Sequence, residues 1–88
     1  MVWDNSEEVP ALLEWRELES SALVAVAYPE EEQLLFAEFH TGEVYLYFDV
    51  PPEEFQNLLG ADSKGRYFNP RIRDRFRCLR LGLYRRRN

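Results

Sequence analysis

Residues 42–61, GEVYLYFDVPPEEFQNLLGA, contain the step from strand to helix that decides the fold. The first part, residues 44–49, is rich in aromatic and β-branched residues, which favours a strand. The second part, residues 50–61, predicts a helix. Pro52 suits the first turn, the acidic residues beside it complement the helix dipole, and Gly60 is suited to end the helix. The chain therefore passes from strands to helices within this stretch.

Two more strands are predicted upstream. Residues 21–28, SALVAVAY, carry no charge and are rich in Val and Ala, which is typical of a buried strand. Residues 34–39, LLFAEF, are predicted to pair with residues 44–49. The turn between them, HTGE at 40–43, is tight, and Gly42 supplies the positive φ that such turns need. A three-stranded antiparallel meander is expected.

The register of this hairpin predicts its two faces. If His40 lies opposite Glu43, one face of the hairpin is entirely apolar. That face carries Leu35, Ala37, Phe39, Val44, Leu46 and Phe48. The other face carries Leu34, Phe36, Glu38, Tyr45, Tyr47 and Asp49. A slip of one residue would exchange the faces.

Two short helical turns are predicted after the helix, in the segments DSKGRYF and NPRIRDRF of residues 62–76. Ser63 and Asn69 are candidate N-caps, and Pro70 suits a first helical position. Residues 77–84 fit either a last strand or an extended tail. Strands followed by helices indicate an α+β fold, a three-stranded antiparallel meander packed by C-terminal helices.

The remaining parts of the chain flank this domain, which is expected over residues 20–81. Residues 1–19 form an N-terminal extension, in which Ser6 is a candidate N-cap of an additional helical segment. Its apolar residues at helical spacing are Val9, Leu12 and Leu13. A short extended piece is expected at 15–18. Residues 82–88 form a basic tail.

Charge divides the chain into two unequal parts. Residues 1–63 contain fifteen acidic residues and one basic residue, whereas residues 64–88 contain ten basic residues and one acidic residue, for a net charge of −5. The basic segment is either a surface for a polyanion or the internal counterpart of the acidic part. Net negative charge opposes nucleic-acid binding unless the charges are separated in space.

Composition narrows the class of protein. Eighty-eight residues, 45% of them hydrophobic, make one compact domain. Cys78 is the single cysteine, which excludes an intramolecular disulfide and a cysteine-based zinc site and fits a reducing compartment. No run of about 18 apolar residues and no signal-peptide pattern occur, so a cytoplasmic protein without a membrane contact is expected.

Four short motifs in residues 45–76 form a recognisable pattern. They are Tyr45-Leu46-Tyr47, Phe48-Asp49-Val50-Pro51, Gly65-x-Tyr67-Phe68-Asn69 and Ile72-Arg73-x-Arg75-Phe76. Together they resemble the KTSC domain, a family named for a domain at the C-terminus of some lysyl-tRNA synthetases and found also as a free-standing bacterial protein. The resemblance covers about 60 of 88 residues. It implies a three-stranded sheet with helical C-terminal elements. The family is of unknown role, with no established catalytic residues and with RNA binding suggested.

Three features depart from that family. The N-terminal extension is longer than the usual lead, and the tail continues past Leu81. Phe36 and Leu46 are apolar at strand positions that are often polar in the family. These extra apolar residues suggest that Val9, Leu12 and Leu13 cover part of the sheet. A contact in a dimer is the alternative.

The candidate functional residues are aromatic and basic. Tyrosines two apart on one strand face, Tyr45 and Tyr47, either stack on unpaired bases or pack under a helix. Arginine suits bidentate phosphate contact, but ion pairs with Glu53, Glu54, Asp49 or Asp62 are the alternative. The predicted nucleic-acid-binding set is Tyr45, Tyr47, Lys64, Arg66, Tyr67, Phe68, Asn69, Arg71, Arg73 and Arg75.

No arrangement of residues predicts catalysis or metal binding. His40 is the only histidine, and it has no cysteine or second histidine to share a metal and no serine–acid arrangement around it. We therefore expect a non-enzymatic binding module without cofactor or metal. RNA or tRNA binding through the basic C-terminal half is the first hypothesis, and protein interaction or self-association is the second. Arginines free of the acids favour the first; arginines paired with Glu53, Glu54 and Asp62 favour the second.

Overall fold

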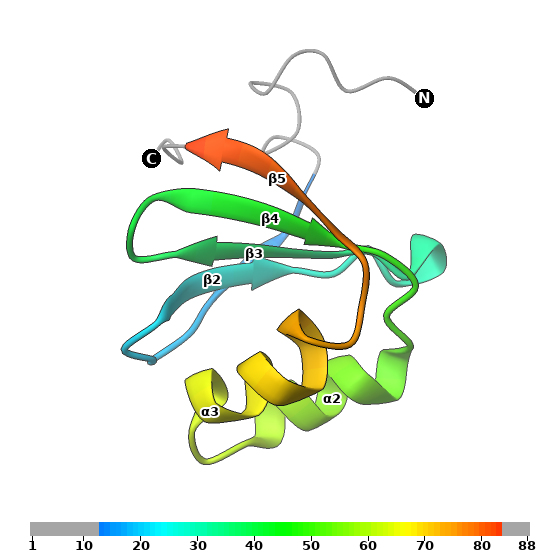
Figure 1. Cartoon of the computed structure of the whole chain (residues 1–88). Helices are drawn as coiled ribbons and strands as arrows, with labels where there is room; N and C mark the ends of the chain where they lie inside the picture. The colour runs from blue at the N-terminus through cyan, green and yellow to red at the C-terminus, as the bar shows by residue number, and fades with distance from the viewer. Residues whose placement is uncertain (1–12, 84–88) are drawn as a thin grey trace.

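A five-stranded antiparallel sheet with helices on one face forms the domain (Figure 1). The structure is a computed structural model and describes residues 13–83. The strands are β1 (Trp15–Glu17), β2 (Leu23–Ala27), β3 (Leu35–Phe39), β4 (Glu43–Tyr47) and β5 (Cys78–Leu83). The helices are α2 (Pro52–Gly60) and α3 (Lys64–Phe68), with short 3₁₀ and π segments at η1 (Glu30–Glu32) and η2 (Asn69–Arg73). The α+β class and the antiparallel sheet are thus confirmed.

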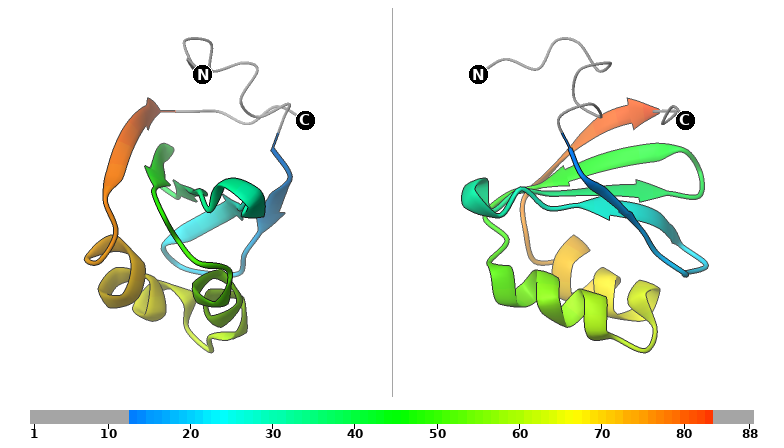
Figure 2. Two further views of the ribbon diagram at one scale, coloured as in Figure 1. Left: turned by 90° about the vertical axis from the view of Figure 1, so that its right-hand side faces the viewer. Right: turned by 180° about the vertical axis from the view of Figure 1, so that it is seen from behind.

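The prediction of three strands is wrong, because two further strands extend the meander at its edges. The strand order is β1-β2-β3-β4-β5, with β1 and β5 outermost (Figure 2). β1 forms from the expected extended piece and sets Trp15 opposite Ala27. β5 returns after the helices and sets Cys78 opposite Tyr47. This second pairing joins segments far apart in sequence, so local pattern does not predict it. The helix predicted in the N-terminal extension falls mainly on residues outside the described part.

The predicted register of the central hairpin is wrong by one residue. Glu38 lies opposite Val44, whereas the prediction placed Phe39 there. The loop contains three residues and not two, and Gly42 within it has a φ of 95° as expected. The Gly42 N–H donates to the Phe39 carbonyl at 2.8 Å. A three-residue loop with glycine in the left-handed region is a standard hairpin connection.

This shift moves the tyrosines of β4 to the helix-covered face. The main core lies between sheet and helices and consists of Leu23, Val26, Leu35, Ala37, Tyr47, Val50, Phe55, Leu58, Phe68 and Ile72. Tyr45 packs against it. Leu46 and Phe48, predicted on this face, instead lie in a smaller cluster on the other face, since side chains alternate along a strand.

The smaller cluster buries Phe36 and Leu46, which are apolar at strand positions that are often polar in the family that the sequence resembles. Phe36 and Leu46 are 0% and 5% exposed, and Leu13 and Trp15 pack against them. The expected contact of Leu13 with the sheet is therefore present, whereas Val9 and Leu12 fall outside the described residues. No helix within residues 13–83 has the length and apolar character needed to cross a membrane.

Candidate nucleic-acid interface

The basic residues lie mainly on one continuous helical segment, α3 followed by η2. Its start is the predicted one, because the Ser63 hydroxyl accepts the Arg66 N–H at 3.4 Å. The second predicted start, at Asn69, is wrong, since Asn69 is helical and the two turns run together. Pro70 has no N–H to donate, and the chain widens there into a π-type turn in which Asp74 N–H donates to the Asn69 carbonyl at 3.0 Å.

One stripe of this segment faces the core. Phe68 and Ile72, four residues apart, are 1% and 0% exposed. Tyr67 and Arg71 share one flank of this stripe, and the Arg71 guanidinium carbon lies 5.7 Å from the Tyr67 ring centroid. Asn69 and Arg73 lie on the other flank and line a groove. The two flanks have different surroundings.

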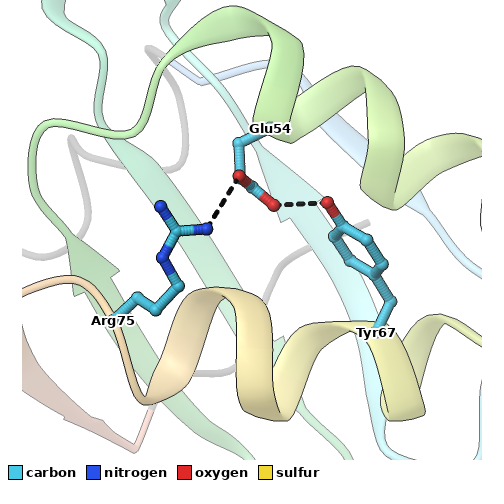
Figure 3. Close-up of polar contacts among 3 residues, drawn as sticks. All are labelled: Glu54, Tyr67 and Arg75. Carbon is cyan, nitrogen blue, oxygen red and sulfur yellow. Dashed lines mark hydrogen bonds and ion pairs between the residues drawn. The ribbon is translucent and has the colours of Figure 1, made fainter.

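A buried acid, Glu54 of α2, contacts Tyr67 on the first flank and also contacts Arg75 (Figure 3). The Tyr67 hydroxyl donates to one Glu54 oxygen, and Arg75 Nη1 lies 3.4 Å from the other. Burial, followed by the hydrogen bond to Glu54, raises the pKa of Tyr67 above its ordinary value. We call these three residues the Glu54 cluster. It joins the segment to α2 and engages two residues of the predicted binding set, Tyr67 and Arg75.

An ion pair between an arginine and Glu54 was only one of the alternatives predicted from the sequence. The hydrogen bond from Tyr67 to Glu54 was not predicted. An acid in the first turn of a helix was expected to complement the dipole, which gives no reason for burial. Its position directly before the buried Phe55 was the available signal.

The other basic side chains divide by partner. Arg80 is paired with Glu43, with its Nη2 and Nε 2.9 Å and 3.0 Å from one oxygen. Lys64 donates to the Ala61 carbonyl at 3.0 Å. Within residues 13–83, no ion pair engages Arg66, Arg71 or Arg77. In the same range, Glu53, Asp49 and Asp62 pair with no arginine. The arginines are thus neither all free nor all interlocked with the acids.

The groove beside Asn69 and Arg73 has a volume of about 410 Å³. It lies between the β3–β4 hairpin and η2. Among its lining residues are Phe39, His40, Tyr45, Tyr47, Asn69, Arg73 and Cys78. Four members of the predicted set, drawn from three of the motifs, therefore meet here. A smaller groove of about 290 Å³ beside Arg16, Tyr28 and Phe55 contains none of that set.

The two tyrosines of β4 differ in accessibility. Tyr47 is 1% exposed, and burial is the largest cause that raises the pKa of its hydroxyl. Tyr45 is half-buried, and its ring meets Phe39 edge-on at 5.6 Å between centroids. Of the two alternatives for Tyr47, packing under a helix is therefore the one observed. Stacking on a base is excluded for its ring and for the equally buried Phe68, because both rings belong to the core. Tyr45 retains an accessible part.

His40 lies at the rim of the groove with a defined ring orientation. Its Nε2 is 2.9 Å from the Ser20 carbonyl oxygen. Since a carbonyl only accepts, Nε2 must carry the proton in this contact. Ser20 also caps the start of β2, because its hydroxyl accepts the N–H groups of Ala22 and Leu23 at 3.1 Å and 3.2 Å. Within residues 13–83, no group of three His, Cys, Asp or Glu side chains is placed to hold a metal.

Comparison with known proteins gives consistent matches. The KTSC domain model matches residues 19–76. A protein of Tsukamurella paurometabola is 47% identical over 64 residues, which cover 73% of this chain and 96% of that protein. A crystal structure of a KTSC domain protein from Yersinia pestis superposes with a TM-score of 0.76 at 30% identity, covering 80% of this chain and 99% of that one.

The chain is also similar to a small part of larger proteins. A lysine–tRNA ligase of Nostoc punctiforme is 41% identical over 63 residues. These residues are 72% of this chain but 11% of the ligase. The similarity therefore concerns one region of the ligase and not its whole length.

Proposed function

The chain belongs to the KTSC domain family, and we propose that it is a cytoplasmic, non-catalytic module that binds single-stranded RNA through the exposed arginines of α3 and η2. We call Arg66, Arg71 and Arg73 the basic ridge. All three are exposed and lie within eight residues of one helical segment. Guanidinium groups are suited to bidentate contact with phosphate, which positions a nucleic-acid backbone.

The observation that carries this proposal is the availability of the ridge. Arg66 and Arg71 make no ion pair within residues 13–83, and Arg73 pairs only with its exposed neighbour Asp74. Two of the acids are already engaged, because Glu54 contacts Arg75 and Glu43 contacts Arg80. A net charge of −5 therefore does not prevent a local positive surface.

The relationship to a region of lysine–tRNA ligases supports an RNA ligand in particular. Those proteins are named for a reaction on tRNA. A domain shared between them and a small protein such as that of Tsukamurella paurometabola is consistent with a role in RNA contact. This support comes by analogy, and the ridge supplies the physical argument.

The test is binding of labelled single-stranded RNA, and of a tRNA mixture, over a salt series. We expect the logarithm of the affinity to fall linearly with the logarithm of salt, with a slope of about −0.7 per phosphate contacted. Arg66→Glu and Arg71→Glu should each weaken binding and reduce this slope. Arg16→Glu is the matched control, since it makes the same charge change on β1. No binding at low salt, or equal loss in the control, would contradict the proposal.

Self-association is the second candidate, and the edge strand β5 favours it. Leu79, Leu81 and Leu83 are the large hydrophobic side chains that residues 13–83 leave exposed. An antiparallel pairing of β5 with a second copy, centred on Leu81, would place Leu79 opposite Leu83 and Arg80 opposite Gly82. Like charges would then not meet. A β-bulge in the pairing of β5 with β4 makes this edge less regular and disfavours its pairing with another strand. Self-association is therefore the second candidate.

Sedimentation velocity over a concentration series tests this candidate. Self-association predicts a dimer that Leu81→Lys dissolves and that Gln56→Lys, an exposed change on α2, leaves intact. A monomer at every concentration would reject it.

A further inference from the structure

We propose that the groove between the β3–β4 hairpin and η2 holds one unpaired nucleotide, with its base against Tyr45 and its phosphate on Arg73. This inference rests on the proposed RNA-binding function and names the place where a base, rather than the backbone alone, is bound. The ridge by itself explains only contact with phosphates. The groove lies directly beside the ridge, since Arg73 belongs to both.

The groove has suitable size and one suitable wall. Its volume of about 410 Å³ falls within the range of about 300 to 1,000 Å³ usual for small-molecule sites. Tyr45 is half-buried and is braced by Phe39 at 87° and by Tyr47 at 6.4 Å between ring centroids. A ring that neighbours already hold in place loses little freedom when a base stacks on it.

The charges around the groove permit a phosphate. The Arg73 side chain is 56% exposed, and its pair with Asp74, at 3.2 Å, is equally exposed and therefore weak. A phosphate offers a bidentate partner that exchanges readily with such a neighbour. Glu43 also lines the groove, but the two contacts of Arg80 with its carboxylate offset its charge. The rim that would otherwise repel a phosphate is thus neutralised.

Polar groups at the rim can meet the edge of a base. Asn69 is exposed, and its side chain makes no hydrogen bond within the part of the chain that the structure describes. Its amide provides both donors and an acceptor. His40 Nε2 lies 2.9 Å from the Ser20 carbonyl oxygen, which leaves Nδ1 as the ring nitrogen without a partner in this contact. Unpaired bases are recognised by this combination of stacking and hydrogen bonds.

The experiment is a nuclear magnetic resonance titration of the full chain with adenosine 5′-monophosphate. We expect shifts in the backbone amide resonances of His40, Tyr45, Asn69 and Arg73. Adenosine without phosphate should bind about fivefold more weakly, and inorganic phosphate alone should shift only the signals around Arg73. Arg73→Ala should weaken the nucleotide about fivefold, whereas Arg71→Ala, on the opposite flank, should not change it. Shifts elsewhere, or none up to about 10 mM nucleotide, would overturn the inference.

A second arm uses an eight-nucleotide single-stranded RNA and separates the two proposals. Tighter binding of the RNA than of the mononucleotide, with the same groove signals moving, supports both and identifies RNA as the source of the nucleotide. RNA binding that leaves Tyr45 and Asn69 unmoved would overturn the groove assignment alone. Nucleotide binding in the groove without RNA binding would support the groove assignment and contradict the RNA-binding function.

Tyr45→Leu and Asn69→Ala complete the set of variants. Because Tyr45 packs against the core, the binding result for Tyr45→Leu is interpreted only if the amide spectrum shows that the variant is folded. Asn69 is exposed, so Asn69→Ala keeps the test independent of folding. We expect either change to weaken the nucleotide and to leave the contribution of Arg66 to RNA binding unchanged.

Discussion

Arg73 and Arg75 lie two residues apart and have nearly equal exposure, but their acidic partners differ. Their side chains are 56% and 51% exposed. Arg75 contacts Glu54, whose side chain is 9% exposed, whereas Arg73 contacts Asp74, whose side chain is 57% exposed. The burial of the acidic partner therefore distinguishes an arginine that holds the fold from one that is available to a ligand.

The physical reason is the hydration of the carboxylate. A buried carboxylate that loses its partners remains unsolvated, and this costs considerably more than the pair itself contributes. An exposed carboxylate returns to water at little cost. The Glu54 cluster should therefore act in stability, and Arg73 in binding.

The largest expected effect comes from breaking the Glu54 cluster. Glu54→Ala removes the acceptor of Tyr67 and the partner of Arg75, and we expect the free energy of unfolding to fall by about 2 kcal/mol. Urea denaturation at neutral pH measures this. Glu53, the exposed neighbour of Glu54, provides the control, since Glu53→Ala should change stability by less than about 0.5 kcal/mol. An equal effect of the two changes would remove the distinction drawn here.

The next effect is a dependence of stability on alkaline pH that comes from Tyr47. Its hydroxyl has a pKa raised above the ordinary 10.0, chiefly by burial. The folded state thus holds the proton more tightly than the unfolded state. The resulting stability is complete below the unfolded pKa and is lost as pH rises above it. By pH 11 this loss amounts to about 1.4 kcal/mol.

Urea denaturation of the wild type and Tyr47→Phe at pH 9 and pH 11 isolates this contribution. The other tyrosines with raised pKa values, Tyr28 and Tyr67, are present in both proteins and cancel. The wild type should lose about 1.4 kcal/mol more than the variant. Parallel losses would show that the Tyr47 hydroxyl ionises in the folded state, and hence that Tyr47 is as accessible as a ligand-binding tyrosine.

Replacing either of the two arginines by alanine should have a smaller effect on stability. Arg75→Ala should reduce stability by about 1 kcal/mol, because its own half-exposure limits the contribution of the pair with Glu54. Arg73→Ala should leave stability within about 0.5 kcal/mol of wild type and should weaken RNA binding. Denaturation and RNA affinity are measured on both variants. If Arg75→Ala weakened RNA and spared stability, the comparison would be reversed.

The smallest expected effect concerns Asp74. Asp74→Asn removes an exposed acid that contacts Arg73 at 3.2 Å, so stability should change by less than about 0.5 kcal/mol. RNA binding should strengthen, because Arg73 loses a competing partner. Weaker RNA binding in this variant would indicate that Asp74 orients Arg73 rather than competing for it.

Local chemistry predicted the parts of this fold that depend on neighbouring residues. The helix after Pro52, the cap at Ser63 and the positive φ of Gly42 follow from single residue types and are present. The faces of β4 were not predicted, because one additional loop residue moves every side chain of a strand to the opposite face. Tyr45 and Tyr47 consequently face the helices.

The candidate site could not be predicted from local sequence, because it depends on contacts between residues that are far apart in the chain. Tyr45, Asn69 and Arg73 were each identified as candidates, but their meeting in one groove depends on how η2 folds back beside β4. Residues 77–84 were expected as either a last strand or an extended tail, but the pairing of β5 with β4 was not predicted, since its partner lies more than thirty residues earlier in the chain. The burial of Glu54 depends on the packing of α2 against the segment that follows it.

The most direct test of RNA binding at the ridge and groove is photo-cross-linking to a single-stranded RNA that contains 4-thiouridine, with the modified residues identified by mass spectrometry. Cross-links should fall on residues 64–73 and on Tyr45, and they should diminish with added salt and with unlabelled RNA. Cross-links confined to β1, η1 or the β5 edge, or their absence at low salt, would contradict the account.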